Sequence, residues 1–194
     1  VTPAAVIPAR GRGVNGRRSV EDRVEDSTLQ LLRSKGPRSV TVEAVAKNSG
    51  VAKTTIYRRY RNRSDLLTSA LSRLVSLRSP DPGTKPPDRL RWLIRHAVEM
   101  VEDGVGLGGV AAMLTDDDPE FTALCRRILV AQREQLSAAI DAGKADGSMR
   151  ADIDGATLID AIVGTYLAEH ARSDNVTGNW EERLFAFFWP AVRR

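Results

Sequence analysis

Apolar residues near the N-terminus recur at helical spacing, in short segments separated by turn residues. Within residues 19–35, one side of the expected helix carries Val20, Val24, Leu31 and Leu32. Ser19 stands where an N-cap is expected, and Gly36-Pro37 interrupts the pattern at its far end. These features predict a first helix over residues 19–35.

Two shorter helices are expected next, joined by a tight turn. Thr41 is placed to cap a helix over residues 42–48. Ser49-Gly50-Val51 predicts the turn, because glycine supplies the backbone freedom that a sharp reversal needs. A third helix is expected over residues 53–60. Asn62 would cap a fourth, paired with Asp65 in its first turn, and that helix would run to residue 78.

The C-terminal part begins after a proline-rich segment. Residues 79–88, SPDPGTKPPD, hold four prolines and a glycine, which is typical of a domain boundary. Beyond it, the apolar period predicts helices over residues 88–103, 119–144, 153–172 and 180–192. Since no alternating strand pattern of useful length and no internal repeat occurs, we expect an all-α fold with about nine helices.

The charges are segregated along the chain. Residues 1–79 hold 16 Lys and Arg against 6 Asp and Glu, whereas residues 80–194 hold 13 against 19, which gives +10 and −6 within the total of +4. A basic block joined to an acidic one suggests a polyanion as the partner of the first block. Residues 1–18 contain no acid and are rich in Pro, Gly and Arg, so they predict a disordered basic arm, with Arg17 and Arg18 as candidate DNA contacts.

The segment TVEAVAKNSGVAKTTIYRRY, residues 41–60, carries the most specific pattern. Ala46 is small enough for two helices to cross, Gly50 forms the turn, and Ile56 points inward, which is the helix–turn–helix spacing. With Ile56 buried, the outer arc of the third helix holds Lys53, Thr54, Tyr57 and Arg58. These side chains suit base edges and phosphates. The alternative is a basic amphipathic helix that is cationic only for solubility.

At these residues the chain resembles the TetR family of bacterial transcriptional regulators. The resemblance spans residues 29–67 and includes LQLLRSKG, residues 29–36, and NRSDLL, residues 62–67. It implies an N-terminal helix–turn–helix domain over residues 19–79 and a C-terminal effector-binding and dimerisation domain over residues 80–194. The departures are modest: Thr54 and Arg59 stand where the family commonly has other residues, which bears on the operator sequence.

The resemblance also implies which residues touch DNA. Thr41 would bond a phosphate, and Lys53, Thr54 and Thr55 would meet bases or backbone in the major groove. Tyr57 would contact a phosphate or a thymine methyl group, and Arg63 would hold the backbone. Arg58 and Arg59 are either phosphate clamps or solvated charges, and we favour clamps.

Candidate effector contacts lie in the middle helices. Apolar bulk is mixed there with a few polar groups, as in ligand cavities, although each residue could equally be ordinary core. The candidates are Trp92, His96, Met100, Met113, Phe121, Cys125, Ile128 and Gln132.

The last two helices are the candidate dimer interface. Aromatic and aliphatic residues are more abundant there than one domain face requires, and surplus apolar surface usually marks a partner contact. The candidates are Leu158, Ile162, Tyr166, Leu184 and Phe188. The alternative is a simple helical hairpin core. A dimer would place two recognition helices about 34–36 Å apart to read two half-sites.

Other chemistry finds little support in the sequence. Neither histidine has a partner at metal-ligand spacing, the run TDDDPE at residues 115–120 suits a helix start, and GVGLGG at residues 104–109 lacks the ending of a phosphate loop. One cysteine and no long apolar run or signal segment suggest a cytoplasmic protein. We therefore expect no metal or cofactor and no enzyme. The leading hypothesis is a ligand-responsive homodimeric repressor that binds a palindromic DNA operator and no membrane, and the alternative is an architectural or activator DNA-binding protein without an effector.

Overall fold

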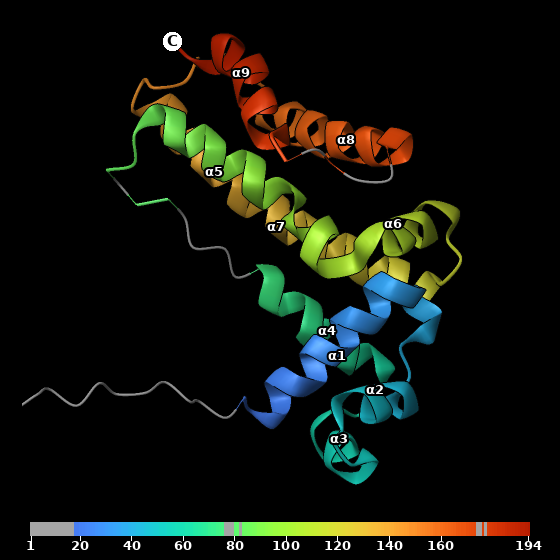
Figure 1. The fold of residues 1–194 in the computed structure, drawn as a ribbon. Helices are drawn as coiled ribbons and strands as arrows, with labels where there is room; N and C mark the ends of the chain where they lie inside the picture. The colour runs from blue at the N-terminus through green and yellow to red at the C-terminus, as the bar shows by residue number, and fades with distance from the viewer. Residues whose placement is uncertain (1–17, 76–79, 82, 174–175, 177) are drawn as a thin grey trace, which may run out of the picture.

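The computed structural model describes residues 18–75, 80–81, 83–173, 176 and 178–194, and these are helical with short connections (Figure 1). The elements in chain order are α1 (Val20–Lys35), η1 (Pro37–Ser39), α2 (Val42–Ser49), α3 (Lys53–Arg59), α4 (Arg63–Val75), α5 (Pro86–Glu99), the π-helical η2 (Met100–Val105), α6 (Gly106–Thr115), α7 (Pro119–Ala145), α8 (Gly155–Ser173) and α9 (Trp180–Val192). The all-α prediction and its number of helices are confirmed over this part of the chain.

Local capping explains where several helices begin. The Ser19 hydroxyl accepts the Asp22 N–H, and the Asp22 carboxylate accepts the Ser19 N–H, which completes a capping box. Thr41 accepts from Ala44 at the start of α2, and Asp118 accepts from Phe121 at the start of α7. The predicted caps at residues 19 and 41 are therefore confirmed, and Asp118 caps the helix start expected within residues 115–120.

A first core joins the four N-terminal helices to the start of the C-terminal part. Buried residues of α1 to α4, such as Leu32 and Leu66, pack in one cluster with Met100, Ala112 and Phe121. Helix α1 contacts α2, α4, α6 and η2, and α4 contacts α7. The predicted boundary at residues 79–80 consequently separates two segments of sequence that share one core.

A second core holds the remaining helices together. It contains buried residues of α5, α7, α8 and α9, among them Ile94, Ile140, Ile162 and Leu184. In Figure 1, α7 runs beside α5 through the length of this part, with α8 and α9 at the end opposite α3. The molecule therefore presents α3 at one end and the α8–α9 pair at the other.

The helix predicted over residues 88–103 is interrupted. The α-helix ends at Glu99, and the chain continues as the π-helical η2 into α6. Gly106 has a φ of 66°, a left-handed conformation that favours glycine. A Cβ there would lie 2.9 Å from the Arg33 Cα, so glycine also permits the close approach of α6 to α1. The glycine-rich residues 104–109 thus contribute to the contact between the two parts of the chain.

Candidate functional site

The two sides of α3 differ as the sequence predicted. Val51, Ile56 and Tyr60 are buried, with Ile56 fully enclosed. Lys53, Thr54, Tyr57 and Arg58 are exposed, and more than half of the Tyr57 side chain is accessible. Thr55 lies at the margin. The helix therefore offers a surface of cationic, hydroxyl and aromatic groups at the tip of the molecule (Figure 1).

The turn before α3 is fixed by backbone geometry and by α1. Gly50 has a φ of 66°, and its N–H donates to the Ala46 carbonyl at 3.0 Å. The Arg23 guanidinium of α1 donates to the Ser49 carbonyl at 2.6 Å. Because α1 and the turn hold each other, α3 is presented as a rigid element, which is the requirement for reading a groove.

Several of the candidate DNA contacts already have partners within the protein. Lys53 pairs with Glu43 at 3.3 Å and Arg59 with Glu21 at 2.5 Å. The backbone N–H of Glu43 and the Lys53 ammonium lower the pKa of the Glu43 carboxyl. These pairs are substantially exposed, so phosphates could compete for the cations at small cost. The Thr41 hydroxyl accepts from Ala44 N–H, which leaves its own proton to donate.

The expected position of Arg63 requires correction. Its guanidinium donates to the carbonyls of Val40 and Pro37, at 3.0 and 2.7 Å, and to the Asp118 carboxylate at 2.6 Å. Only 24% of its side chain is exposed. The side chain points into the contact with α7, so it is not available as the phosphate contact implied by the resemblance. Asp118 is 55 residues away in sequence, which is why no local pattern indicated the pair.

The basic arm is described only at its end. Arg18 pairs with Asp26 at 3.2 Å and remains largely exposed. Arg17 and the rest of the predicted arm lie outside the described residues, so their expected DNA contact stays a prediction.

Three arginines of the N-terminal helices hold the two flanks of α6. Arg33 of α1 donates to the Asp103 carbonyl, before α6. Arg38 of η1 donates to the backbone carbonyl of Asp117 at 2.6 Å and pairs with its carboxylate at 2.9 Å, after α6. Arg63 binds the next residue, Asp118. We call this set of contacts the arginine clamp; sequence reasoning missed it.

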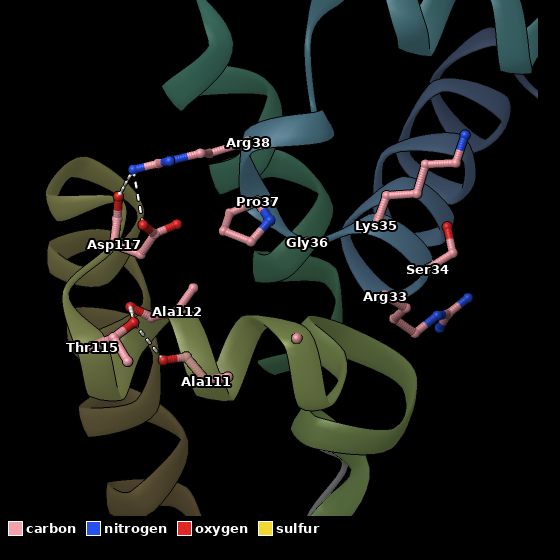
Figure 2. A pocket seen from close by; sticks show the side chains of 11 residues that line it. Arg33, Ser34, Lys35, Gly36, Pro37, Arg38, Ala111, Ala112, Thr115 and Asp117 are labelled. Atoms are coloured by element: carbon pink, nitrogen blue, oxygen red, sulfur yellow. Dashed lines mark hydrogen bonds and ion pairs between the residues drawn. The ribbon is translucent and has the colours of Figure 1, made fainter.

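A hollow of about 630 Å³ lies between the end of α1, η1 and α6 (Figure 2). In Figure 2, Arg38 reaches across its top to Asp117, whereas Arg33 and Lys35 point away from the α6 side. Its cationic groups therefore do not converge on one point. We assign this hollow to the domain contact and not to a ligand.

The eight candidate effector contacts do not form one site. Met100, Met113, Phe121, Cys125 and Ile128 pack in the core shared with the N-terminal helices. Burial raises the pKa of the Cys125 thiol to about 12, which makes it unreactive. Trp92 and His96 stack on each other on α5, with ring centroids 4.4 Å apart. The separation follows from the length of α7, which passes through both cores.

Met100 and Gln132 do meet at a cavity. A pocket of about 230 Å³ opens between α5, η2, α7 and α8, and we call it the α5–α8 pocket. Its wall is formed by Ala97, Met100, Val101, Leu129, Gln132, Arg133, Leu136, Ile159, Asp160 and Val163. No pattern in the sequence indicated Arg133 and Asp160, because their pairing depends on the packing of α7 on α8.

The predicted dimer residues also require correction. Leu158, Ile162, Tyr166 and Leu184 are at most 7% exposed and belong to the second core, so they have no surface to offer a partner; Phe188 is half-buried. The most apolar stripe of each helix packs within the protomer. Phe187 of α9 is instead 74% exposed, and Gly164 and Ala168 lie on the outer side of α8.

The described residues show neither a cluster of metal-ligand side chains nor a membrane-spanning helix. They contain no group of three or more His, Cys, Asp or Glu side chains placed to hold a metal ion. Among them, no helix is both long and apolar enough to cross a membrane.

Sequence similarity to known proteins is concentrated in the N-terminal helices. Residues 26–70, which include α2, α3 and the start of α4, match the family model of bacterial regulatory proteins of the tetR family. The helix–turn–helix part of the chain is thus similar to regulators of the tetR family. It is 32% identical over 103 residues to the HTH-type transcriptional repressor KstR of Rhodococcus jostii, an alignment that covers 51% of this chain and 49% of KstR. The chain thus spans about half the length of this curated relative.

Solved structures extend the likeness in fold to nearly the whole chain. A TetR-family transcriptional regulator from Rhodococcus sp. superposes with a TM-score of 0.70 at 19% identity, covering 90% of this chain and 98% of that one. A transcriptional regulator from Saccharomonospora viridis in complex with choline superposes with a TM-score of 0.58 at 16% identity, covering 90% and 97%. At these identities the likeness establishes the fold of this chain and nothing beyond the fold.

Proposed function

We propose that this protein is a sequence-specific DNA-binding transcriptional regulator of the TetR family, which acts as a homodimeric repressor and leaves its operator when a small molecule binds. The observation that carries the proposal is the division of α3 into a buried side and an exposed side. The exposed side combines Lys53 and Arg58, which suit phosphates and guanine, with Thr54 and Tyr57, which suit base edges and thymine methyl groups.

The sequence similarity supports the DNA-binding half of the proposal. The match to the family model, residues 26–70, lies within the part that presents α3. The relative KstR is a repressor, and the similarity to it is reported over about half of each chain. Repression by this chain is accordingly an inference from a partial match together with the surface of α3.

A dimer would place two copies of α3 on one face of DNA. The exposed Phe187 and the small outer residues of α8, Gly164 and Ala168, offer an apolar surface at the end of the molecule opposite α3. Small residues allow helices of two subunits to approach closely, and an exposed phenylalanine is a typical anchor of such contacts. We therefore assign the dimer contact to this outer face of α8 and α9.

The proposed response to a ligand follows from the connection between the α5–α8 pocket and the arginine clamp. Met100 and Val101 line the pocket and belong to η2, which leads directly into α6. Both flanks of α6 are held by Arg33, Arg38 and Arg63 of the DNA-binding helices. A ligand that displaces η2 would move these flanks and rotate α3, and linkage requires that DNA in turn weakens ligand binding.

The choline complex of the similar regulator from Saccharomonospora viridis supports a ligand site on this fold. An architectural protein without an effector is the alternative, for which a solidly packed C-terminal part would be the expected structure. The presence of the α5–α8 pocket favours the ligand-responsive interpretation.

Selection of bound sequences from random DNA tests the proposal. The enriched sequence should be palindromic, and a screen of metabolites against that complex should yield a compound that releases the DNA. Arg58→Ala should lower affinity for the enriched sequence, whereas Arg126→Ala, an exposed position on α7, should leave it unchanged. No enrichment above the starting pool, or equal effects of the two variants, would contradict it.

A further inference from the structure

The chemistry of the α5–α8 pocket indicates what kind of molecule it accepts. A ligand of this pocket would be the effector of the same regulator, so the inference rests on the proposed function. The wall is mainly aliphatic, with Ala97, Val101, Leu129, Leu136, Ile159 and Val163 contributed by three helices and η2. Such a wall favours an apolar body, and the volume of about 230 Å³ limits it to a small one.

Arg133 of α7 lines this pocket, and one of its N–H donors lacks an acceptor among the described residues. Its Nη2 donates to the Ala156 carbonyl at 3.1 Å and to the Asp160 carboxylate. Its Nε is buried and finds no acceptor among the described residues. A buried N–H without a partner is unfavourable, and a ligand that brings an acceptor to it restores the missing hydrogen bond.

The charges at the pocket cancel each other. Arg133 and Asp160 both line it and form an ion pair. An anionic ligand would therefore be repelled by the Asp160 carboxylate, and a cationic ligand would be repelled by the Arg133 guanidinium. The remaining polar residue is Gln132, which is 4% exposed and donates its amide to the His96 carbonyl at 3.1 Å. Net charge on the ligand consequently has no uncompensated partner here.

We propose that the α5–α8 pocket binds a small neutral molecule with an apolar body and one oxygen acceptor, such as a ketone or ester, whose oxygen accepts from Arg133 Nε. The acceptor orients the molecule at the α7–α8 side, and its apolar body lies against Met100 and Val101 of η2. This places the ligand in contact with the segment that leads into α6.

Three probes of equal chain length test the charge preference: nonan-2-one, nonanoate and nonylammonium. Binding to the full chain is measured by calorimetry, and the operator complex is followed separately by fluorescence anisotropy. Nonan-2-one should bind most tightly. Arg133→Lys, which retains the charge but removes Nε, should weaken it by about 2- to 12-fold, as expected for the loss of one hydrogen bond. Arg127→Lys, an exposed position on the same helix, is the matched control and should leave binding unchanged.

Asp160→Asn provides a second test that does not depend on the folding of the Arg133 variant. The substitution leaves Arg133 without its carboxylate, so binding of nonanoate should strengthen by about fivefold, the size expected for removing one nearby like charge in a partly solvated site. The preference for the neutral ketone should shrink accordingly.

The outcomes separate this inference from the proposed function. Equal or tighter binding of nonanoate or nonylammonium to the wild-type chain would overturn the assignment of a neutral ligand. Absence of binding by all three probes would also overturn the assignment if operator binding is intact, because the chain would then be folded and the pocket would still take none of the ligands. Binding of nonan-2-one without release of DNA would support the pocket assignment and contradict the proposed ligand response.

Discussion

Replacing Asp118 by asparagine tests whether the arginine clamp stabilises the contact between the two parts of the chain. The Asp118 side chain is 11% exposed and that of its partner Arg63 is 24% exposed. Removing one partner of a fully buried ion pair costs about 3–5 kcal/mol. Because both groups keep some contact with water and asparagine retains an acceptor, we expect a loss of about 2 kcal/mol from the free energy of unfolding.

A comparison of variants isolates the clamp from the helix cap. The amide side chain in Asp118→Asn would still accept the Phe121 N–H, whereas Asp118→Ala removes that cap too and should cost about 1 kcal/mol more. Asp141→Asn is the matched control on the same helix, since that carboxylate is 72% exposed and pairs with Lys144 at 3.7 Å. It should change stability by less than about 0.5 kcal/mol.

The pH dependence gives an independent check on Asp118. Burial alone raises its pKa, but the Arg63 hydrogen bond, the Phe121 N–H and the charges of Arg63 and Arg38 together lower it below 3.8. A lowered carboxyl pKa stabilises the fold above the pKa of the unfolded chain, and that stability is lost as pH falls through the folded value. In urea unfolding, the free energy of unfolding of Asp118→Asn should lie below that of the wild type by the full amount above about pH 5. The two free energies should converge as the pH falls below 3.8. A difference that is constant with pH, or equal to that of Asp141→Asn, would refute the clamp.

Three further substitutions test the domain contact, the dimer face and the DNA face. Gly106→Ala should lower the free energy of unfolding by at least about 2 kcal/mol, because its φ is positive and the backbone of α1 lies 2.9 Å from the new Cβ. Gly83→Ala, at an exposed position with nothing within 4 Å of the new Cβ, should not destabilise the chain, and thermal unfolding compares the two. Phe187→Asp should weaken dimerisation by about tenfold or more in sedimentation, and Leu114→Asp, also exposed but on α6, should not; an unchanged dimer would rule out the α8–α9 face. Lys53→Ala should reduce the slope of log affinity against log salt by about 0.9, and an unchanged slope would reject a phosphate contact there.

The exposed face of α3 could be predicted because the phase of the helix is set locally. Ala46, Gly50 and Ile56 lie within one short segment, and together they determine which side of α3 packs inward. Capping is equally local, since Ser19 and Thr41 bond N–H groups three residues away. Interactions over such short separations leave a direct trace in the sequence.

The contacts of Arg63 and the proposed dimer face could not be predicted in this way. Arg63 meets Asp118 through tertiary packing across 55 residues, so its side chain serves a contact that no spacing indicates. On α8, the apolar pattern identifies the most hydrophobic stripe, which the protomer itself buries around Ile162. The outer face carries smaller residues such as Gly164, which produce no hydrophobic signal.

The α5–α8 pocket shows the same limit for the proposed ligand site. Periodicity marks bulky residues such as Phe121, and packing places that side chain in the core beneath the DNA-binding helices. A pocket arises where large side chains are absent between helices, as beside Ala97. Among the predicted effector contacts, only Met100 and Gln132 line this cavity, and α8, which contributes Ile159, Asp160 and Val163 to its wall, held none of the candidates.

The ratio of affinities for an enriched operator and a scrambled DNA of the same length tests the central claim most directly. At moderate salt the wild-type chain should favour the operator by at least about a thousandfold. Thr54→Ala should reduce that ratio, because the side chain lies on the exposed face of α3, and Thr157→Ala at the distant α8 should leave it unchanged. Equal affinity of the wild type for both DNAs would contradict the account.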